Sequence, residues 1–180
     1  MDAVAALRAD LPVLLPTDGV YGLCCAVTED AVRRLYELKG RAARQPTAVI
    51  AASADAARAL VPELDAAQLV RGPYTLVLPN PERRLAFLAG ERPETIGVRL
   101  PQLPAATQAV LDAVGAVVAT SANEPGEPAA ASLDEVSPRI RDGCGAELDG
   151  GTLPGIASTV VDLTGPEPVV LREGAGTWPP

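Results

Sequence analysis

Short apolar runs alternate along this chain with segments whose apolar residues recur at helical spacing. The runs predict buried strands, and the periodic segments predict helices. Strands are predicted at residues 13–15, 24–27, 47–52, 74–78, 95–100, 116–120, 158–162 and 169–172, with a short one near Glu147; helices are predicted at 2–9, 29–38, 53–60, 81–89, 105–114 and 132–141. Alternating strands and helices predict an α/β fold, and the sheet is mixed because the last strands lack crossover helices.

Residues that favour helix ends support several of these boundaries. Thr28 is a good N-cap for helix 29–38, and Gly40 suits the turn that ends it. Pro81 stands where a helix tolerates proline, at its start. Ser132 and Glu135 have the spacing of a capping box for the helix at 132–141.

The composition indicates one folded domain. The chain has 180 residues, of which 48% are hydrophobic but only 3% aromatic, so the core must consist of Ala, Val and Leu. We find no repeat and no internal linker, and therefore expect a single domain over residues 1–180. The net charge of −8 argues against a broad nucleic-acid surface, although a small basic cleft is compatible with it.

Cysteine and histidine usage narrows the chemistry further. There is no histidine, which excludes histidine-based triads and histidine metal sites. The three cysteines, Cys24, Cys25 and Cys144, form no Cys-x-x-Cys pair, so a zinc site is not expected. Their odd number fits a reducing compartment, and we expect a cytoplasmic protein without a signal peptide or membrane segment.

Lys39 is the only lysine among the 15 lysines and arginines of the chain. It stands two residues before Arg41, at the end of a predicted helix. One interpretation is that two cations are aimed at one polyanion. The other is a solvated basic helix end that complements the helix dipole.

Six polar fragments remain after weak motifs are set aside. No Walker A pattern is present, and the glycines at 174 and 176 lie too near the end for a dinucleotide loop. The fragments are the turn at Thr17, Lys39–Arg41, Thr95–Arg99, Ala119–Asn123, Ser158–Asp162 and Arg172–Gly174. All but the second lie at or beside a predicted strand end. Their hydroxyls, amide and cations could therefore meet at one rim, where they would suit phosphate and carboxylate recognition.

In this order the fragments resemble the YrdC-like domain, the L-threonylcarbamoyladenylate synthase family. The resemblance extends over residues 11–174. The family's motifs appear as Pro16–Leu23, Lys39 with Arg41, Ser121 with Asn123, Ser158–Asp162 and Arg172–Gly174. Each piece alone is weak, but all of them in order form a specific signal.

The chain departs from the family pattern at several positions. Gly19 replaces a threonine of the first motif, and Gln45–Thr47 followed by Ile50 replaces Asn-Pro-Leu and a histidine. The stretches 72–75 and 95–99 are closer to the YciO branch, whose role is less settled.

The resemblance implies a twisted, mixed sheet flanked by helices, with a concave, positively charged groove. It implies that L-threonine, bicarbonate and ATP give threonylcarbamoyl-AMP and pyrophosphate. A separate transferase would use the product to modify a tRNA adenosine beside the anticodon. Mg²⁺ would be carried by the ATP phosphates, with no metal held by protein side chains. A weak contact with tRNA or double-stranded RNA is left open, and no membrane partner is expected.

The resemblance also implies site residues. The catalytic residues would be Lys39, Arg41, Ser121 and Asn123. ATP would be bound by Lys39, Arg41, Gln45, Thr95, Ala119, Ala129 and Arg172. Threonine would be bound by Thr17, Gly19, Arg99, Ser121 and Ser158.

Two other interpretations stay open. Gly19 and Ile50 would suit a YciO-like paralogue that acts on a related carbamoyl adenylate. A non-catalytic RNA-binding module would use the basic residues Arg33, Arg34, Lys39, Arg41 and Arg44, but the net charge argues against it.

Overall fold

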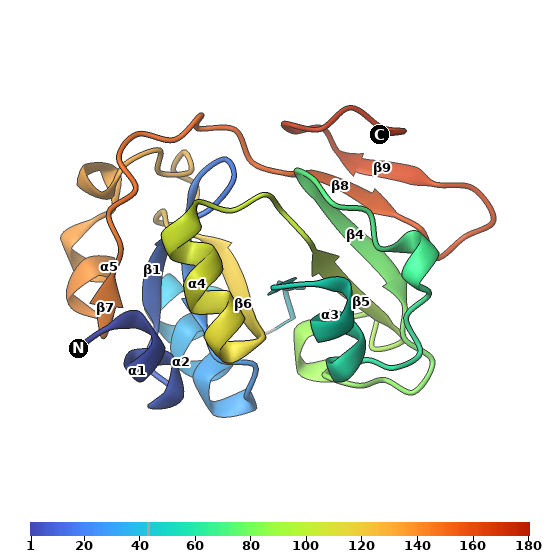
Figure 1. Cartoon of the computed structure of the whole chain (residues 1–180), viewed down its shortest axis with the longest axis horizontal. Helices are drawn as coiled ribbons and strands as arrows, with labels where there is room; N and C mark the ends of the chain where they lie inside the picture. Colours follow the sequence, from blue (N-terminus) through green and yellow to red (C-terminus); the bar gives the residue numbers. More distant parts are fainter. Residues whose placement is uncertain (43) are drawn as a thin grey trace.

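One nine-stranded mixed sheet forms the framework of the computed structural model, which describes residues 1–42 and 44–180 (Figure 1). The strands are β1 (Val13–Pro16), β2 (Tyr21–Cys25), β3 (Ala48–Ala51), β4 (Tyr74–Pro79), β5 (Thr95–Arg99), β6 (Ala116–Ser121), β7 (Ala146–Glu147), β8 (Thr159–Asp162) and β9 (Val169–Arg172). Their order is β7-β1-β2-β6-β3-β5-β4-β8-β9. The predicted α/β fold with a mixed sheet is confirmed, because parallel pairs such as β3–β5 stand beside antiparallel ones such as β1–β2.

Helices cover both faces of the sheet. The α-helices are α1 (Ala3–Arg8), α2 (Glu29–Lys39), α3 (Ala54–Leu60), α4 (Ala105–Val114) and α5 (Pro138–Asp142), and short 3₁₀ helices lie at Ala66–Gln68, Ala86–Leu88 and Leu133–Glu135. The alternation of side chains along β1 shows the two layers. Leu14 packs in the core that includes Leu35 of α2, whereas Val13 and Leu15 pack in the core that includes Leu111 of α4.

The two halves of the sheet are buried differently. Every residue of β1 and β2 is buried, as expected for strands covered on both faces. In β4, by contrast, buried residues alternate with half-exposed or exposed ones, and β5 shows the same alternation from Ile96 onward. Leu76 and Val98 point into the core, while their neighbours Val77 and Gly97 line a cavity on the other face.

The predicted caps of α2 are confirmed. The backbone N–H of Ala31 donates to Thr28 Oγ1 at 3.2 Å. Gly40 ends the helix with a φ of 67°, a left-handed conformation that glycine adopts without strain. Local chemistry alone therefore places Lys39 in the last turn of α2.

Two predicted helices are wrong. Residues 81–89 form turns and only the short 3₁₀ helix Ala86–Leu88. The buried side chain of Asn80 bonds both the N–H and the carbonyl of Arg84, which replaces helical hydrogen bonds with a turn. Arg83 and Leu85 accordingly have positive φ angles of 53°.

The segment 132–141 is also not one helix. Ser132 makes no capping bond, and Glu135 accepts instead from the N–H of Ala131. A separate helix, α5, begins at Pro138 with Ser137 as its cap, because proline suits a first turn and not a helix interior. The predicted strand at 24–27 is likewise shifted, since β2 is Tyr21–Cys25.

A long segment after β7 connects one edge of the sheet to β8, and it crosses the end of the sheet along the top of Figure 1. The buried Tyr21 holds its beginning: the hydroxyl donates to the Gly151 carbonyl at 2.9 Å and accepts from the N–H of Gly150 at 2.8 Å. Further along, the N–H of Gly155 donates to the Gly19 carbonyl at 2.8 Å. A Cβ atom at Gly19 would lie 2.0 Å from the Ile156 carbonyl oxygen. Gly19 therefore leaves no empty space beside the site, because this segment fills it.

Candidate active site

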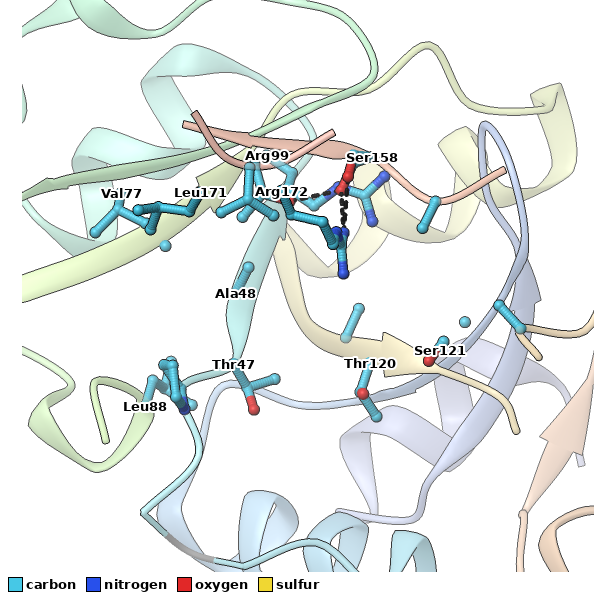
Figure 2. A pocket seen from close by; sticks show the side chains of 18 of the residues that line it. Thr47, Ala48, Val77, Leu88, Arg99, Thr120, Ser121, Ser158, Leu171 and Arg172 are labelled. Carbon is cyan, nitrogen blue, oxygen red and sulfur yellow. Dashed lines mark hydrogen bonds between the residues drawn. The ribbon is translucent and has the colours of Figure 1, made fainter. Parts of the chain in front are cut away.

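A cavity of about 610 Å³ opens over the half-exposed face of the sheet. Residues of β3, β4, β5, β6, β8 and β9 line it, together with the turn between β1 and β2 (Figure 2). Its charged lining residues in the described part of the chain are Arg41, Arg92, Arg99, Arg172 and Glu127. Four guanidinium groups against one carboxylate suit an anionic ligand.

One wall of this cavity is apolar. Val77, Leu88, Val160 and Leu171 contribute side chains to it, and Figure 2 shows Val77 and Leu171 side by side. The small residues Ala48 and Gly97 also line the cavity. An apolar wall next to a cluster of arginines suits a ligand with a flat organic part and a charged part.

Arg172 and Ser158 face each other across the ends of β9 and β8. Arg172 Nη2 donates to the Ser158 carbonyl at 2.7 Å, and a longer contact of 3.4 Å reaches Ser158 Oγ (Figure 2). Ser158 Oγ also shares a hydrogen bond of 2.8 Å with Thr75 Oγ1. Burial, and then the nearby charge of Arg99, lower the pKa of Arg172. A bound anion would relieve this repulsion between the two arginines.

Arg99 is paired with Asp18. Its Nη2 donates to Asp18 Oδ1 at 2.6 Å, and both side chains are largely buried. The pair is not bidentate: Arg99 Nε and Asp18 Oδ2 are buried without a hydrogen-bond partner among the described residues. Arg99, which lines the cavity, is therefore not fully satisfied by the protein.

Arg41 reaches the cavity from beyond the end of α2. Its Nη2 donates to the Pro46 carbonyl at 2.5 Å, and its Nη1 lies 3.4 Å from Thr120 Oγ1. Burial lowers the pKa of Arg41, and its buried Nε has no partner among the described residues. This guanidinium, too, is only partly satisfied by the protein.

Lys39 is held quite differently. Its ammonium donates to the Ser121 carbonyl at 2.7 Å, to Asn123 Oδ1 at 2.9 Å and to the Asn123 carbonyl. These three acceptors use all three N–H bonds of the ammonium. Burial, followed by the charge of Arg41, lowers the pKa of Lys39 to about 8. Lys39 is not among the described residues that line the cavity.

Asn123 completes this contact. Its Nδ2 donates to the carbonyls of Glu124 at 2.9 Å and Glu127 at 2.6 Å, while its Oδ1 accepts from Lys39. The side chain is therefore fully engaged within the protein. It shapes the loop that follows β6, which ends at Ser121. Ser121 and Asn123 both line the cavity, and we call this part of its edge the rim.

The structure brings most of the predicted site residues together. The cavity is lined by Thr17, Arg41, Thr95, Arg99, Ala119, Ser121, Asn123, Ala129, Ser158 and Arg172. Three predicted residues are not among its described lining residues: Lys39, Gly19 and Gln45. Lys39 lies behind the rim, Gly19 lies against Ile156, and Gln45 is exposed on the surface.

Sequence reasoning missed Arg92 and the apolar wall. Arg92 lines the cavity while it donates to Asp162 at 2.7 Å and to Thr164 Oγ1 at 2.9 Å. The only signal in the sequence was the alternation of polar and apolar residues in 74–78 and 95–99, which indicates that one face of these strands is not covered by the core. Arg92 lies outside the strands and carried no such signal.

The sequence profile of the Sua5/YciO/YrdC family, which carries the description "Telomere recombination", matches residues 5–174. The chain belongs to this family. A threonylcarbamoyl-AMP synthase of Pyrococcus abyssi is 36% identical over 180 residues, which cover 96% of this chain and 53% of that protein. The enzyme of that name from Chromohalobacter salexigens is 36% identical over 171 residues, which cover 90% of this chain and 91% of that protein.

Solved structures of the Sua5/YciO/YrdC family have the same fold. The crystal structure of P. abyssi Sua5 complexed with L-threonine superposes with a TM-score of 0.81 at 34% identity, covering 96% of this chain and 53% of that one. Escherichia coli YciO superposes with a TM-score of 0.84 at 28% identity, covering 97% of this chain and 88% of that one. The chain spans about half the length of the P. abyssi and Bacillus subtilis relatives that it matches.

Other site types find little support in the described residues. No group of three or more His, Cys, Asp or Glu side chains there could hold a metal ion. No helix in this part of the chain is long and apolar enough to cross a membrane. In the basic cluster considered for RNA, Arg33 is paired with Asp30 and Glu37, and Lys39 is buried. This pairing leaves less positive charge for a polyanion than the sequence suggested.

Proposed function

We propose that the protein is a threonylcarbamoyl-AMP synthase, a nucleotidyltransferase that converts L-threonine, bicarbonate and ATP into threonylcarbamoyl-AMP, pyrophosphate and water. The observation that carries the proposal is the cavity itself. It joins three incompletely satisfied guanidinium groups, those of Arg41, Arg99 and Arg172, to an apolar wall. The names of the relatives in the family, and the threonine bound to P. abyssi Sua5, support the same substrates.

The chemistry needs positioning and charge neutralisation more than a strong base. The threonine amine loses a proton and forms a C–N bond with the carbon of CO₂ derived from bicarbonate. A carbamate oxygen then attacks the α-phosphate of ATP, and the bond to pyrophosphate breaks. Negative charge accumulates on the phosphates throughout, where arginines and a Mg²⁺ ion that arrives with ATP would stabilise it.

The arrangement suggests a division of roles. Arg99 would bind the threonine carboxylate from the lining of the cavity, with Thr17 and Ser158 lining the same space. Arg41 and Arg172 would hold the phosphates and the leaving pyrophosphate. Ser121 would donate its hydroxyl to a reacting oxygen, while Lys39 and Asn123 would fix the rim behind it. Thr95, Ala119 and Ala129 would contact the nucleotide.

The deciding experiment is pyrophosphate release with ATP and bicarbonate, comparing threonine with serine, valine and no amino acid. We expect release that depends on both threonine and bicarbonate. Release that is equal without an amino acid would indicate an ATP hydrolase, and no release with any of them would refute the proposal.

A YciO-like role is the second candidate. The observation that favours it is the close superposition on E. coli YciO, of which this chain covers 88%. A paralogue of this kind would act on an existing carbamoyl adenylate rather than make one. Incubation with threonylcarbamoyl-AMP distinguishes the two roles, because only the paralogue would consume it without pyrophosphate.

In its wider setting, we propose that residues 1–180 act as one domain in the cytoplasm. The three free cysteines are consistent with a reducing compartment. A separate transferase would receive the product for the tRNA adenosine beside the anticodon, and any contact of this chain with tRNA or double-stranded RNA would be weak. We expect no membrane partner.

A further inference from the structure

Lys39 and Asn123 come from distant parts of the chain, and a third element holds them together. Lys39 is the last residue of α2, and Asn123 lies in the loop after β6. Their contact decides where Ser121 stands, because Lys39 binds the carbonyl of Ser121 as well.

Arg139 of α5 contacts both sides of this junction. Its Nη1 donates to the carbonyl of Leu38, the residue before Lys39, at 2.7 Å. Its Nε and Nη2 bind the two carboxylate oxygens of Glu124, the residue after Asn123, at 3.0 and 2.5 Å. Ser137 Oγ, also from the start of α5, donates to Glu124 Oε1 at 2.5 Å. One guanidinium therefore links the end of α2 to the loop after β6.

We propose that Glu124 and Arg139 are positioning residues that hold Lys39 against Ser121 and Asn123 and thereby fix the rim of the cavity. This inference rests on the proposed function for its catalytic consequence, but not for its structural one. Neither residue is among the described residues that line the cavity. Both act through Lys39.

We call the contacts of Arg139 with Leu38 and Glu124 the clamp. The charges of its residues act on the titration of Lys39, which can be measured. Arg41 faces Lys39 from beyond the helix end, Glu124 from the loop and Arg139 from α5. The two arginines lower the pKa of Lys39, and Glu124 raises it. A neutral amine has one N–H fewer than an ammonium and cannot satisfy all three acceptors. Glu124 therefore favours the form of Lys39 that holds the rim.

Because Lys39 is the only lysine, its titration can be read without interference. Labelling the full chain with ¹³C-lysine gives a single side-chain signal whose shift follows protonation. We expect the wild-type midpoint near the pKa of about 8 given above. The midpoint should move to lower pH in Glu124→Gln, which removes the favourable charge, and to higher pH in Arg139→Gln, which removes an unfavourable one. Arg139→Lys should keep the wild-type midpoint, because it keeps the charge.

A matched control lies on the same helix. Arg141 binds Glu147 through Nε and Nη2 at 3.0 and 2.6 Å, the same fork geometry, with neither residue among those that contact Lys39 or Asn123. Arg141→Gln should leave the Lys39 midpoint unchanged. Midpoints that are the same in Glu124→Gln, Arg139→Gln and wild type would overturn the proposal, as would an equal shift in Arg141→Gln.

Kinetics then test the catalytic consequence. Glu124→Gln, Arg139→Gln and Arg139→Lys should each lower kcat/KM for pyrophosphate release about threefold to tenfold, with Arg141→Gln at the wild-type value. Shifted midpoints with unchanged kcat/KM would overturn the positioning role. If the wild-type protein itself releases no pyrophosphate, the proposed function fails, and midpoints that move in Glu124→Gln and Arg139→Gln but not in Arg141→Gln still show that the charges of Glu124 and Arg139 act on Lys39. Thermal unfolding of each variant separates a local effect from loss of the fold.

Discussion

The cations on the two sides of the cavity are held in opposite ways. On one side, Lys39 has an acceptor for each of its three N–H bonds and lies behind the rim. On the other side, Arg99 makes one bond to Asp18, and its buried Nε has no partner among the described residues. Arg172 bonds only Ser158 in the same part of the structure.

The difference follows from the shapes of the two side chains. An ammonium is a compact charge that three oxygens can surround, so it serves well as a fixed internal support. A guanidinium presents five donors in a plane, and a protein partner on one edge leaves the other edge for a ligand. We infer that lysine here organises the site while the arginines bind, and the following predictions test this contrast.

The largest effect is expected when the support is removed. Lys39→Met should lower pyrophosphate release about a hundredfold or more, because the acceptors on Ser121 and Asn123 lose their donors and the rim moves. Because the ammonium is behind the rim, kcat should fall more than the KM for ATP rises. Steady-state titration of ATP measures both. A large rise in the KM for ATP with normal kcat would mean that Lys39 binds phosphate directly.

A smaller effect is expected on the binding side. Arg99→Lys keeps the charge beside Asp18 but loses the planar fork, so the KM for threonine should rise about thirtyfold while that for ATP hardly changes. Parallel titrations of the two substrates give both values. If only the KM for ATP rises, Arg99 belongs to the phosphate region and the division of roles is wrong.

The same contrast predicts a pH dependence. The pKa of Lys39 is lowered to about 8, so the ammonium that supports the rim is lost above that pH, and activity should fall about tenfold for each further pH unit. Stability should not follow, because a folded-state pKa below the ordinary value of 10.5 means that this group's contribution to the free energy of unfolding rises between pH 8 and 10.5. Lys39→Arg, which does not titrate in this range, should lack the alkaline decline. A decline that persists in Lys39→Arg would assign it to another group.

The smallest effect on activity is expected from the cysteines, which lie outside both groups of cations. Burial raises the pKa of Cys24 and Cys144 to about 12, so neither provides a thiolate at neutral pH. Changing all three cysteines to alanine should leave pyrophosphate release within about twofold. The wild-type protein should lose stability between pH 9 and 12 as these raised pKa values are reached, and the variant should lose less. Loss of activity with an intact fold would reveal a thiol role.

Local sequence determined most of the framework. Helix α2 begins after Thr28 and ends at Gly40, as predicted, because a cap and a glycine act on their own neighbours. Helix α4 was predicted at its observed bounds from its apolar spacing. The motif residues Arg99, Ser121, Ser158 and Arg172 line one cavity, as expected, because strand ends in one sheet place them at a common edge. Arg41 joins them from beyond the end of α2.

Only the tertiary structure decided which polar groups satisfy one another. Lys39 donates to Asn123, which is 84 residues away in the sequence. No local pattern predicts that its ammonium is bound by acceptors of the protein. The side chain of Asn80 bonds the backbone of Arg84 and so prevents a helix at 81–84. The spacing of apolar residues does not predict such hydrogen bonds. Gly19 was expected to bind threonine, but the Ile156 carbonyl lies where a side chain of this residue would begin, and Gly19 is not among the described residues that line the cavity. In each case the fold brings up a residue that the local sequence pattern does not include. Buried polar groups must find hydrogen-bond partners, so the contact with that residue determines the local structure.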